Sequence, residues 1–390
     1  MDFATSAEQD AMVQTARAFA ERRLAPFYHQ RELEGAMHRP TLAEMGQLGF
    51  LGVELPERYG GLGLPCLTAG LVLEPLCAAD YNIGQLTIVV SLIGTILAEH
   101  GDAAVVEPLL RGMLAGETIP ALALTEPAGG SDAAQLSLRA RRDGDHYVLD
   151  GEKTSTTFIT QADFAVVWAR TGEAASGARG ITAVLVPMDT PGITRGEFED
   201  MGGRSVGRGW MHLDGVRVPT SHRLGAEGGG FVQVMRGFDY SRALIALQCL
   251  AVARQSLDET WADAAERTSF GRPLTAHQGV AFPLAEAETQ LQACRLLCLE
   301  TLWRKDEGLP HTAQAAMCKW WGPKLAFDTI QTCLLTHGHA GYSSELPYEQ
   351  RLRDVLGLQI GDGTAQIMKL LIARAKTPRA APGPTTPPGR

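Results

Sequence analysis

The sequence has no excess of basic residues, and this excludes one large class of function. Its 390 residues include 35 Lys and Arg against 44 Asp and Glu, a formal net charge of −9 at pH 7. A nucleic-acid surface needs clustered Lys and Arg to neutralise phosphates, so we expect no nucleic-acid partner. The remaining composition, 45% hydrophobic and 20% charged, is ordinary for a soluble globular protein.

Long hydrophobic runs are also missing. The longest apolar stretch, around residues 88–97, is too short and too interrupted to span a bilayer. The first residues, MDFATSAE, are acidic without an apolar run, which is not the pattern of a secretory signal. We therefore expect no membrane partner.

The seven cysteines include no Cys-x-x-Cys pair. Cys294 and Cys298 are four residues apart in an apolar helical pattern and share one helix face, but zinc would need further ligands close by. His337 and His339 likewise have no partners at metal-binding spacing. We expect buried free thiols, no metal and a reducing, cytoplasmic location.

Hydrophobic spacing divides the chain into a helical, a β-rich and a second helical part. Helical spacing begins in residues 6–24, where Ser6 and Gln9 resemble a capping box, and recurs to about Met113. The glycine cluster in residues 56–63 has no preceding strand and no βαβ context. We interpret it as a tight surface loop rather than a phosphate loop.

Strand patterns begin after Gly116, and residues 142–145 (RDGD) predict a turn between two strands. The predicted strands include residues 147–149, 164–169, 181–186 and 210–218. Helical spacing returns at Phe231, and long amphipathic stretches there predict a bundle. One predicted apolar face consists of Leu284, Ala287, Leu291, Cys294, Cys298 and Leu302.

These patterns predict four segments along the chain. We place an N-terminal helical domain at residues 1–116, a middle β domain at 117–220 and a helical bundle at 221–377. A tail rich in Pro, Gly and Thr, residues 378–390, is predicted to be disordered.

Residues 360–366 (IGDGTAQ) carry a carboxylate, Asp362, between two glycines. By itself this is a turn pattern, since Asp and Gly favour turns. The segment also resembles the stretch near the C-terminus of acyl-CoA dehydrogenases in which a carboxylate, usually glutamate, precedes Gly-Thr-x-Gln. The resemblance implies that Asp362 takes the α-proton of a thioester, with Gly363 at the substrate and Thr364 and Gln366 at the cofactor.

Residues 124–132 (LTEPAGGSD) resemble the flavin-site signature of the same family. A bland glycine-rich loop, in which small residues let backbone amides approach a ligand, would account for the glycines alone. It would not account for Thr-Glu-Pro and Ser-Asp at this spacing. The resemblance implies FAD as cofactor, with Leu124 and Thr125 against the isoalloxazine ring, Gly130 in the loop, and Ser131 at the cofactor or the CoA moiety.

Residues 151–157 (GEKTSTT) resemble the family's next flavin-contacting segment, which usually reads Trp-Ile-Thr where this chain has Ser-Thr-Thr. The resemblance implies that Thr157 hydrogen-bonds the flavin near N5. Ser155 replaces an aromatic residue that covers the ring and faces the external electron acceptor. The alternative, that these are ordinary strand threonines, stays open.

Residues 267–273 (RTSFGRP) resemble a segment that reaches the flavin pyrophosphate and adenine from a neighbouring subunit. Arginine suits that role because its planar fork grips phosphate oxygens in pairs. The resemblance implies that Arg267, Phe270, Gln278 and, from a glycine loop, Gly338 bind FAD in at least a dimer, and the family is commonly tetrameric. A lone surface arginine is the alternative.

Residues 238–243 (FDYSRA) resemble the family's contacts to the CoA arm, which implies that Phe238, Asp239 and Arg242 bind substrate. The alternative is a pair between Asp239 and Arg242 on a helix surface. In some relatives the catalytic carboxylate comes from the position of Ser241. Serine cannot act as that base, which leaves Asp362.

The resemblance covers about residues 6–376 and implies a mostly α fold with a central β domain: N-terminal helices, a β-barrel-like middle domain and a C-terminal four-helix bundle. It implies α,β-dehydrogenation of an acyl-CoA by α-proton abstraction and β-hydride transfer to flavin N5, with electron-transfer flavoprotein as acceptor. Residues 318–324 and 336–339, with Asp362, resemble the cyclohexanecarboxyl-CoA dehydrogenase branch. The alternatives are an oxygen-using flavin oxidase or monooxygenase on the same fold, and a catalytically silent acyl-CoA- or flavin-binding protein.

Overall fold

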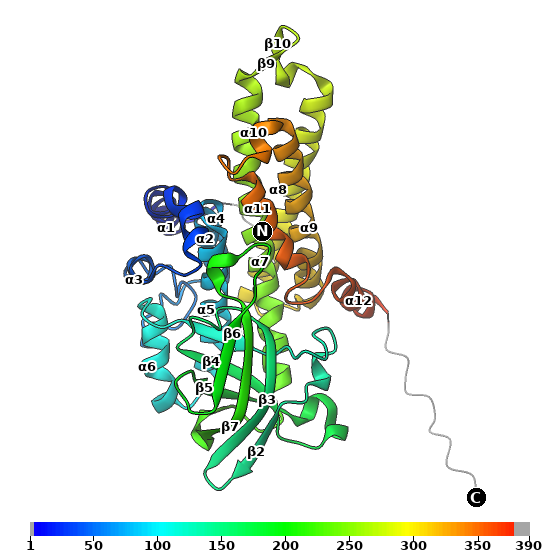
Figure 1. Cartoon of the computed structure of the whole chain (residues 1–390). Helices are drawn as coiled ribbons and strands as arrows, with labels where there is room; N and C mark the ends of the chain where they lie inside the picture. The colour runs from blue at the N-terminus through cyan, green and yellow to red at the C-terminus, as the bar shows by residue number, and fades with distance from the viewer. Residues whose placement is uncertain (1–3, 378–390) are drawn as a thin grey trace, which may run out of the picture.

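The computed structural model describes residues 4–377, so the predicted disordered tail at 378–390 lies outside the described residues. Within this range the chain forms a helical part, then a sheet, then a second helical part (Figure 1). The predicted fold class is therefore confirmed. The sheet lies at one end of the molecule, and the long C-terminal helices extend away from it (Figure 1).

The N-terminal part begins at the predicted capping box. The backbone N–H of Gln9 donates to Ser6 Oγ at 3.2 Å, and the backbone N–H of Ser6 donates to Gln9 Oε1 at 2.9 Å. These bonds satisfy amides that have no partner within the helix. The helix passes into a π-helical turn, Ala20–Leu24. The helices of this part are α1 (Ala7–Phe19), α2 (Tyr28–Glu34), α3 (Arg39–Gln47), α4 (Cys66–Ala79), α5 (Tyr81–His100) and α6 (Ala103–Leu114).

Helix α5 is longer than the apolar stretch predicted at residues 88–97. Its 20 residues are long and apolar enough to cross a membrane by length and composition, so the prediction that this stretch is too short was wrong. However, 83% of its most apolar window is buried inside the fold. Its Asp80 cap accepts from the N–H groups of Asn82 and Ile83. In this structure α5 is a core helix.

The middle part is one sheet with the strand order β6-β7-β3-β2-β4-β5-β8, and β1 pairs in parallel with β4. The predicted turn joins β2 to β3, with Gly144 at φ 63°. The path ends at β6 and β8, so across residues 4–377 the sheet is open. The strands are β1 (Pro120–Ala123), β2 (Arg139–Asp143), β3 (His146–Thr156), β4 (Phe164–Arg170), β5 (Ile181–Pro187), β6 (Ile193–Glu197), β7 (Gly209–Pro219) and β8 (Arg223–Leu224).

Strand β4 is buried on both faces, as its uninterrupted apolar sequence predicts. On one face Val166 and Trp168 join the core formed with the N-terminal helices. On the other face Ala165 and Val167 join a core formed with residues of β3 and β7. Two cores therefore meet at this strand.

The C-terminal part is built on three long helices, α7, α8 and α9, which pack on one another, while α11 and α12 pack on α9. The predicted apolar face of α8 is confirmed, because all six of its residues are buried. All seven cysteines are free thiols, and each is buried except the half-buried Cys66. The helices are α7 (Gly230–Glu266), α8 (Gln278–Asp306), α9 (Thr312–His337), α10 (His339–Tyr342), α11 (Tyr348–Leu356) and α12 (Ala365–Lys376), with a short hairpin of β9 (Thr268–Ser269) and β10 (Arg272–Pro273) between α7 and α8.

The start of α7 is fixed on the sheet by one buried tryptophan. Trp168 Nε1 on β4 donates to the carbonyl of Gly230 at 2.8 Å. Glycine is required at 230, because a Cβ there would lie 2.5 Å from the backbone N of Ala183. This contact sets the position of the α7 residues that follow.

Replacing Trp168 by Phe removes this donor and leaves the Gly230 carbonyl unpaired in the core. We expect the free energy of unfolding to fall by about 1–3 kcal/mol, measured as a lower thermal midpoint. The matched control is Trp303→Phe at a half-buried position of α8, which should shift the midpoint less. Equal midpoints for wild type and Trp168→Phe would contradict the expectation.

Candidate active site

The predicted base lies in a turn between the short 3-10 helix at Gly357–Gln359 and α12. Asp362 has a φ of 54° and Gly363 a φ of 102°. Asp and Asn enter this left-handed region more readily than most residues, and such a conformation costs about 1–3 kcal/mol when a side chain is present. The turn interpretation of this segment is thus correct, and it is compatible with a role as base.

Asp362 is half-buried and lies near two cations. Lys319 on α9 donates to the carbonyl of Gly363 at 3.2 Å, and Arg242 Nη2 on α7 lies 3.9 Å from the position of a Cβ on Gly363. Burial raises the pKa of Asp362 above its ordinary value, while the charges of Lys319 and Arg242 act to lower it. A carboxylate with a raised pKa is a stronger proton acceptor.

The predicted substrate residues on α7 lie in one cluster, in which Phe238 and Arg242 are buried and Asp239 is half-buried. Asp239 pairs with Arg242 at 3.0 Å and accepts a hydrogen bond from Thr312 at 2.6 Å. The pair is not on a helix surface, because Arg242 is only 5% exposed. Arg242 also lies over the ring of Phe238, 5.6 Å from its centroid.

Two buried atoms of this cluster lack protein partners among the described residues: Arg242 Nε and Ser241 Oγ. A buried donor without a partner costs about 1–3 kcal/mol, so an unpaired guanidinium N–H in a native interior needs an explanation. A bound oxygen-bearing ligand would satisfy it. This observation supports the predicted role of Arg242 in substrate binding.

The two predicted flavin segments lie against each other. The backbone N–H of Thr154 donates to the carbonyl of Thr125 at 2.9 Å. Lys153 donates to the carbonyl of Leu124 at 3.0 Å and to Glu126 Oε1 at 2.8 Å. Leu124 and Phe238 belong to the same buried core, which connects these segments with α7.

The ion pair between Glu126 and Lys153 shapes this loop, and the sequence alone did not indicate it. Glu126 also accepts from the N–H and Oγ of Ser137 at 2.6 and 2.7 Å and from the N–H of Leu138 at 2.8 Å. Burial lowers the pKa of Lys153 to about 8 against the attraction of Glu126. Burial acts to raise the pKa of Glu126. The charge of Lys153 and the N–H donors of Ser137 and Leu138 outweigh this effect, so the pKa of Glu126 is lowered. The one signal that could have pointed to this pair was an acidic residue in the first motif and a lysine in the second, which carry opposite charges.

The loop held by this pair fits a flavin. Residues 129–132 are exposed, and a Cβ built on Gly129 meets no atom within 4 Å. The backbone is therefore open to an incoming group, as the small residues predicted. Leu124 is buried, and Thr125 and Thr157 are half-buried.

Ser155 is exposed and has a φ of 53°. Its Oγ accepts from Arg208 Nη1 at 2.6 Å, and Arg208 is also paired with Asp200 and stacked 5.1 Å from the centroid of Phe198. A guanidinium group therefore adjoins the position where the family usually has an aromatic residue. Arg208 carries no local pattern that would have revealed it.

The remaining predicted cofactor residues lie apart from both clusters. Arg267 and Phe270 are at the β9–β10 hairpin, at the end of the bundle far from the sheet (Figure 1), and Gln278 is the first residue of α8. Phe270 is 96% exposed, and Gly338 lies next to Arg267, whose Nη2 is 3.9 Å from a Cβ built there. One copy of the chain does not bring this group to residues 124–132. Their predicted role across a subunit interface stays a prediction.

Of the residues predicted after the base, Thr364 caps α12, since its Oγ1 accepts from the N–H of Ile367 at 3.4 Å. Gln366 is exposed on the first turn of α12. These positions show no further contact that would define a cofactor role. The roles of Thr364 and Gln366 stay predictions.

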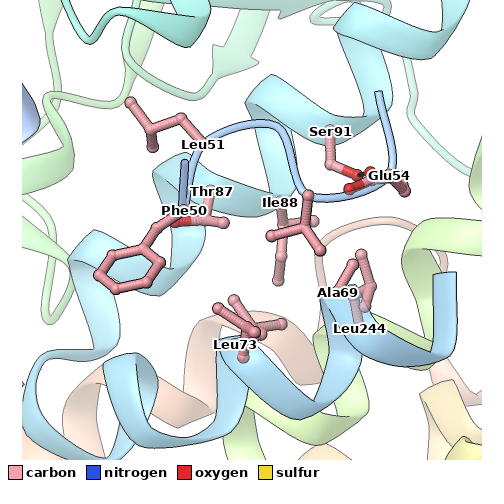
Figure 2. A pocket seen from close by; sticks show the side chains of 11 residues that line it. Phe50, Leu51, Glu54, Ala69, Leu73, Thr87, Ile88, Ser91 and Leu244 are labelled. Atoms are coloured by element: carbon pink, nitrogen blue, oxygen red, sulfur yellow. Dashed lines mark hydrogen bonds between the residues drawn. The ribbon is translucent and has the colours of Figure 1, made fainter. Parts of the chain in front are cut away.

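An internal cavity lies near the site, between α4, α5, residues 50–54 and α7 (Figure 2). Its walls are mostly apolar, and Leu244 of α7 lies two residues beyond Arg242. Ser91 donates to Glu54 at its polar side. The cavity measures about 10 Å³, at the lower limit for one water molecule. It is too small for an acyl chain, so it is not the substrate pocket in this conformation.

Comparisons with known proteins match almost the whole chain. Family models match residues 6–117 (acyl-CoA dehydrogenase, N-terminal domain), 121–216 (middle domain) and 228–377 (C-terminal domain). Benzylmalonyl-CoA dehydrogenase of Aromatoleum aromaticum is 34% identical, over 96% of this chain and 99% of its own length.

Two solved structures have the same fold. One is butyryl-CoA dehydrogenase of Megasphaera elsdenii, at 31% identity and a TM-score of 0.92. The other is a chain in a structure described as the electron transferring flavoprotein of Acidaminococcus fermentans, at 32% identity and a TM-score of 0.93. Both similarities cover 96% of this chain and 99% of the other chain.

Glu126→Gln should destabilise the loop, because it leaves the buried Lys153 ammonium without its counter-charge. We expect a loss of about 3–5 kcal/mol at pH 7, measured as a lower thermal midpoint; the control Glu152→Gln, at an exposed position of β3, should change little. A carboxyl whose pKa is lowered in the folded state stabilises the fold above pH 4.5, which is its ordinary pKa. This contribution is lost as the pH falls through the lowered pKa of the folded state. The gap between variant and wild type should therefore close below pH 4.5, and a gap independent of pH would contradict this assignment.

Proposed function

Because the chain belongs to the acyl-CoA dehydrogenase family, we propose that it oxidises the α,β bond of an acyl-CoA thioester with Asp362 as the base. Members of this family are FAD-dependent oxidoreductases. The observation that carries the assignment of the base is the half-buried Asp362 beside Arg242, whose Nε has no partner among residues 4–377. We also propose that the boundaries between the N-terminal helical, middle β and C-terminal helical domains lie at residues 116/117 and 220/221.

The first step is removal of a proton from the carbon next to the thioester carbonyl. The Asp362 carboxylate accepts this proton, and the C–H electron pair moves toward the carbonyl oxygen. The negative charge on that oxygen needs hydrogen-bond donors fixed before the reaction. The backbone N–H of Asp362 donates to no other described residue. Successive N–H groups in turns that contain a left-handed residue form sites that bind anions.

Residues 124–132 and 151–157 would hold the flavin. FAD, when bound, supplies the acceptor for the two electrons and hydrogen that leave the β-carbon as hydride. The chain's own contribution there is to place Leu124, Thr125, Ser131 and Thr157 along the edge of that site and to exclude water.

The acyl group is proposed to be cyclic, as in cyclohexanecarboxyl-CoA converted to the 1-ene. Aspartate is one methylene shorter than glutamate and leaves more room next to the α-carbon. The left-handed backbone at Asp362 also favours Asp over Glu at this position. Similar proteins are named for other substrates, benzylmalonyl-CoA and butyryl-CoA, so the short base is the main support for a ring.

The electron acceptor is proposed to be an electron-transfer flavoprotein, which is supported by the structural similarity to a chain in a structure described as an electron transferring flavoprotein. A homotetramer, or at least a dimer, is proposed from the position of Arg267 and Phe270, far from residues 124–132. A cytoplasmic location is proposed from the free thiols.

Asp362→Asn tests the base directly. The variant keeps the size of the side chain but loses its basic lone pairs, so it should retain FAD while flavin reduction slows by at least about 10³-fold, in the range of a lost proton-transfer catalyst. The measurement is anaerobic bleaching of the flavin in a single turnover with cyclohexanecarboxyl-CoA and butyryl-CoA. Reduction of Asp362→Asn at nearly the wild-type rate would show that another group is the base.

Asp362→Glu tests the size of the acyl group. The longer side chain should slow reduction by cyclohexanecarboxyl-CoA, because the added methylene competes with the ring for space. With butyryl-CoA the loss should be smaller, and the rate could rise above wild type because the usual reach of the family's base is restored. Single-turnover rates for the two esters give the ratio. A ratio that shifts toward the cyclic ester would show that the match in size is wrong, even if Asp362 is the base.

A further inference from the structure

Lys319 is a buried lysine without a carboxylate partner. It lies on α9 and is 1% exposed, and its ammonium group forms no ion pair with an acidic side chain of residues 4–377. Its Nζ instead donates to the carbonyls of Leu358 at 2.5 Å and Gly363 at 3.2 Å. Burying an ammonium group is costly unless it is well paired, so this position calls for a specific role.

The two carbonyls bracket the segment that carries the base. Leu358 precedes it in the 3-10 helix, and Gly363 follows it directly. Residues 359–362 therefore span two points that are both hydrogen-bonded to one side chain of α9. Within this span Asp362 adopts its left-handed conformation, which an unrestrained loop would leave readily because of its cost.

We propose that Lys319 is the positioning residue of the base: it fastens both ends of the Asp362 loop to α9 and supplies the positive charge that favours the carboxylate. The proposal rests on the role proposed for Asp362. Lys319 acts through Asp362 and takes no proton from the substrate.

Charge and geometry act together here. Lys319 and Arg242 both lower the pKa of Asp362 against the effect of burial. The pKa of Lys319 is itself lowered to about 8, chiefly by burial, with Asp362 and Cys249 acting to raise it and Arg242 to lower it further. Among the described residues, the charge of Asp362 also acts on Tyr81 of α5, whose pKa is raised mainly by burial. Below about pH 8 the cation next to the base is present.

Two variants separate the two roles proposed for Lys319, which are to hold the loop by hydrogen bonds and to supply a positive charge. Lys319→Gln keeps hydrogen-bond donors without the charge, and Lys319→Met removes both. The matched control is Lys324→Met, which removes one positive charge from an exposed position of the same helix, where Lys324 pairs with Asp328. Each holoenzyme is compared with wild type for FAD content, thermal midpoint and single-turnover reduction by cyclohexanecarboxyl-CoA and butyryl-CoA across a range of pH.

We expect the pH at which the reduction rate rises to increase by about one unit in both Lys319 variants. The reason is that a nearby positive charge lowers the pKa of a carboxyl by about that much or more. At the high-pH plateau Lys319→Met should be at least about 10-fold slower, because the base is misplaced, while Lys319→Gln should lose less. Lys324→Met should match wild type. If Lys319→Met does not fold, the shift in Lys319→Gln decides.

A second readout does not depend on the substrate. Infrared absorption of the protonated carboxyl of Asp362, identified by its loss in Asp362→Asn, should persist to higher pH in the Lys319 variants. Wild-type pH dependence of both the rate and this band in both variants would overturn the proposal and leave the base assignment intact. Undiminished reduction by Asp362→Asn would instead overturn the base assignment itself.

Discussion

The constraint on which the molecule depends is the burial of the middle of α7 on all sides. Every residue from Tyr240 to Leu250 is buried, and α7 packs against α4, α5, α8 and α9. A helix in this position must be apolar around its circumference. Burying a polar group within it costs free energy, and apolar packing does not explain why such a group is there. Ser241 and Arg242 are two of these groups. The candidate site lies at these two residues, where α7 is not apolar around its whole circumference.

Because α7 begins on the sheet and ends at the β9–β10 hairpin, it connects two groups of predicted cofactor residues that one copy of the chain keeps apart. Leu124 shares a buried core with Phe238 near the start of α7, and Arg267 follows the last turn of that helix. Near its start α7 also carries the polar cluster next to the base. Two of the three residue groups that the family resemblance assigned to one site are therefore connected through packed elements, and the third lies apart from them in one copy of the chain.

Where one periodicity dominates, the sequence predicted the structure well. The apolar face of α8, the strands β4 and β5 and the capping box at Ser6 follow from spacing and local hydrogen bonds, which tertiary packing reinforces. The extent of α5 was missed because polar residues such as Asn82 and Gln85 interrupt its apolar run, yet both are buried. In the candidate site, Asp362 was predicted by resemblance. The contacts of Lys319 with Gly363 and of Arg208 with Ser155 cross 44 and 53 residues of sequence. No local pattern encodes such contacts.

The length and apolarity of α5 also affect how the chain is made. Its partners on α7 come late: Ser91 bonds to Tyr240 across 149 residues, and Gln248 bonds to the carbonyl of Tyr81 across 167. At ribosomal rates of about 5–20 residues per second, an interval of roughly 7–30 s separates the two helices. For that time a 20-residue segment apolar enough for a membrane has no α7 to cover it. The same helix that fills the finished core is exposed apolar surface in the unfinished chain, the kind of surface through which incomplete chains aggregate.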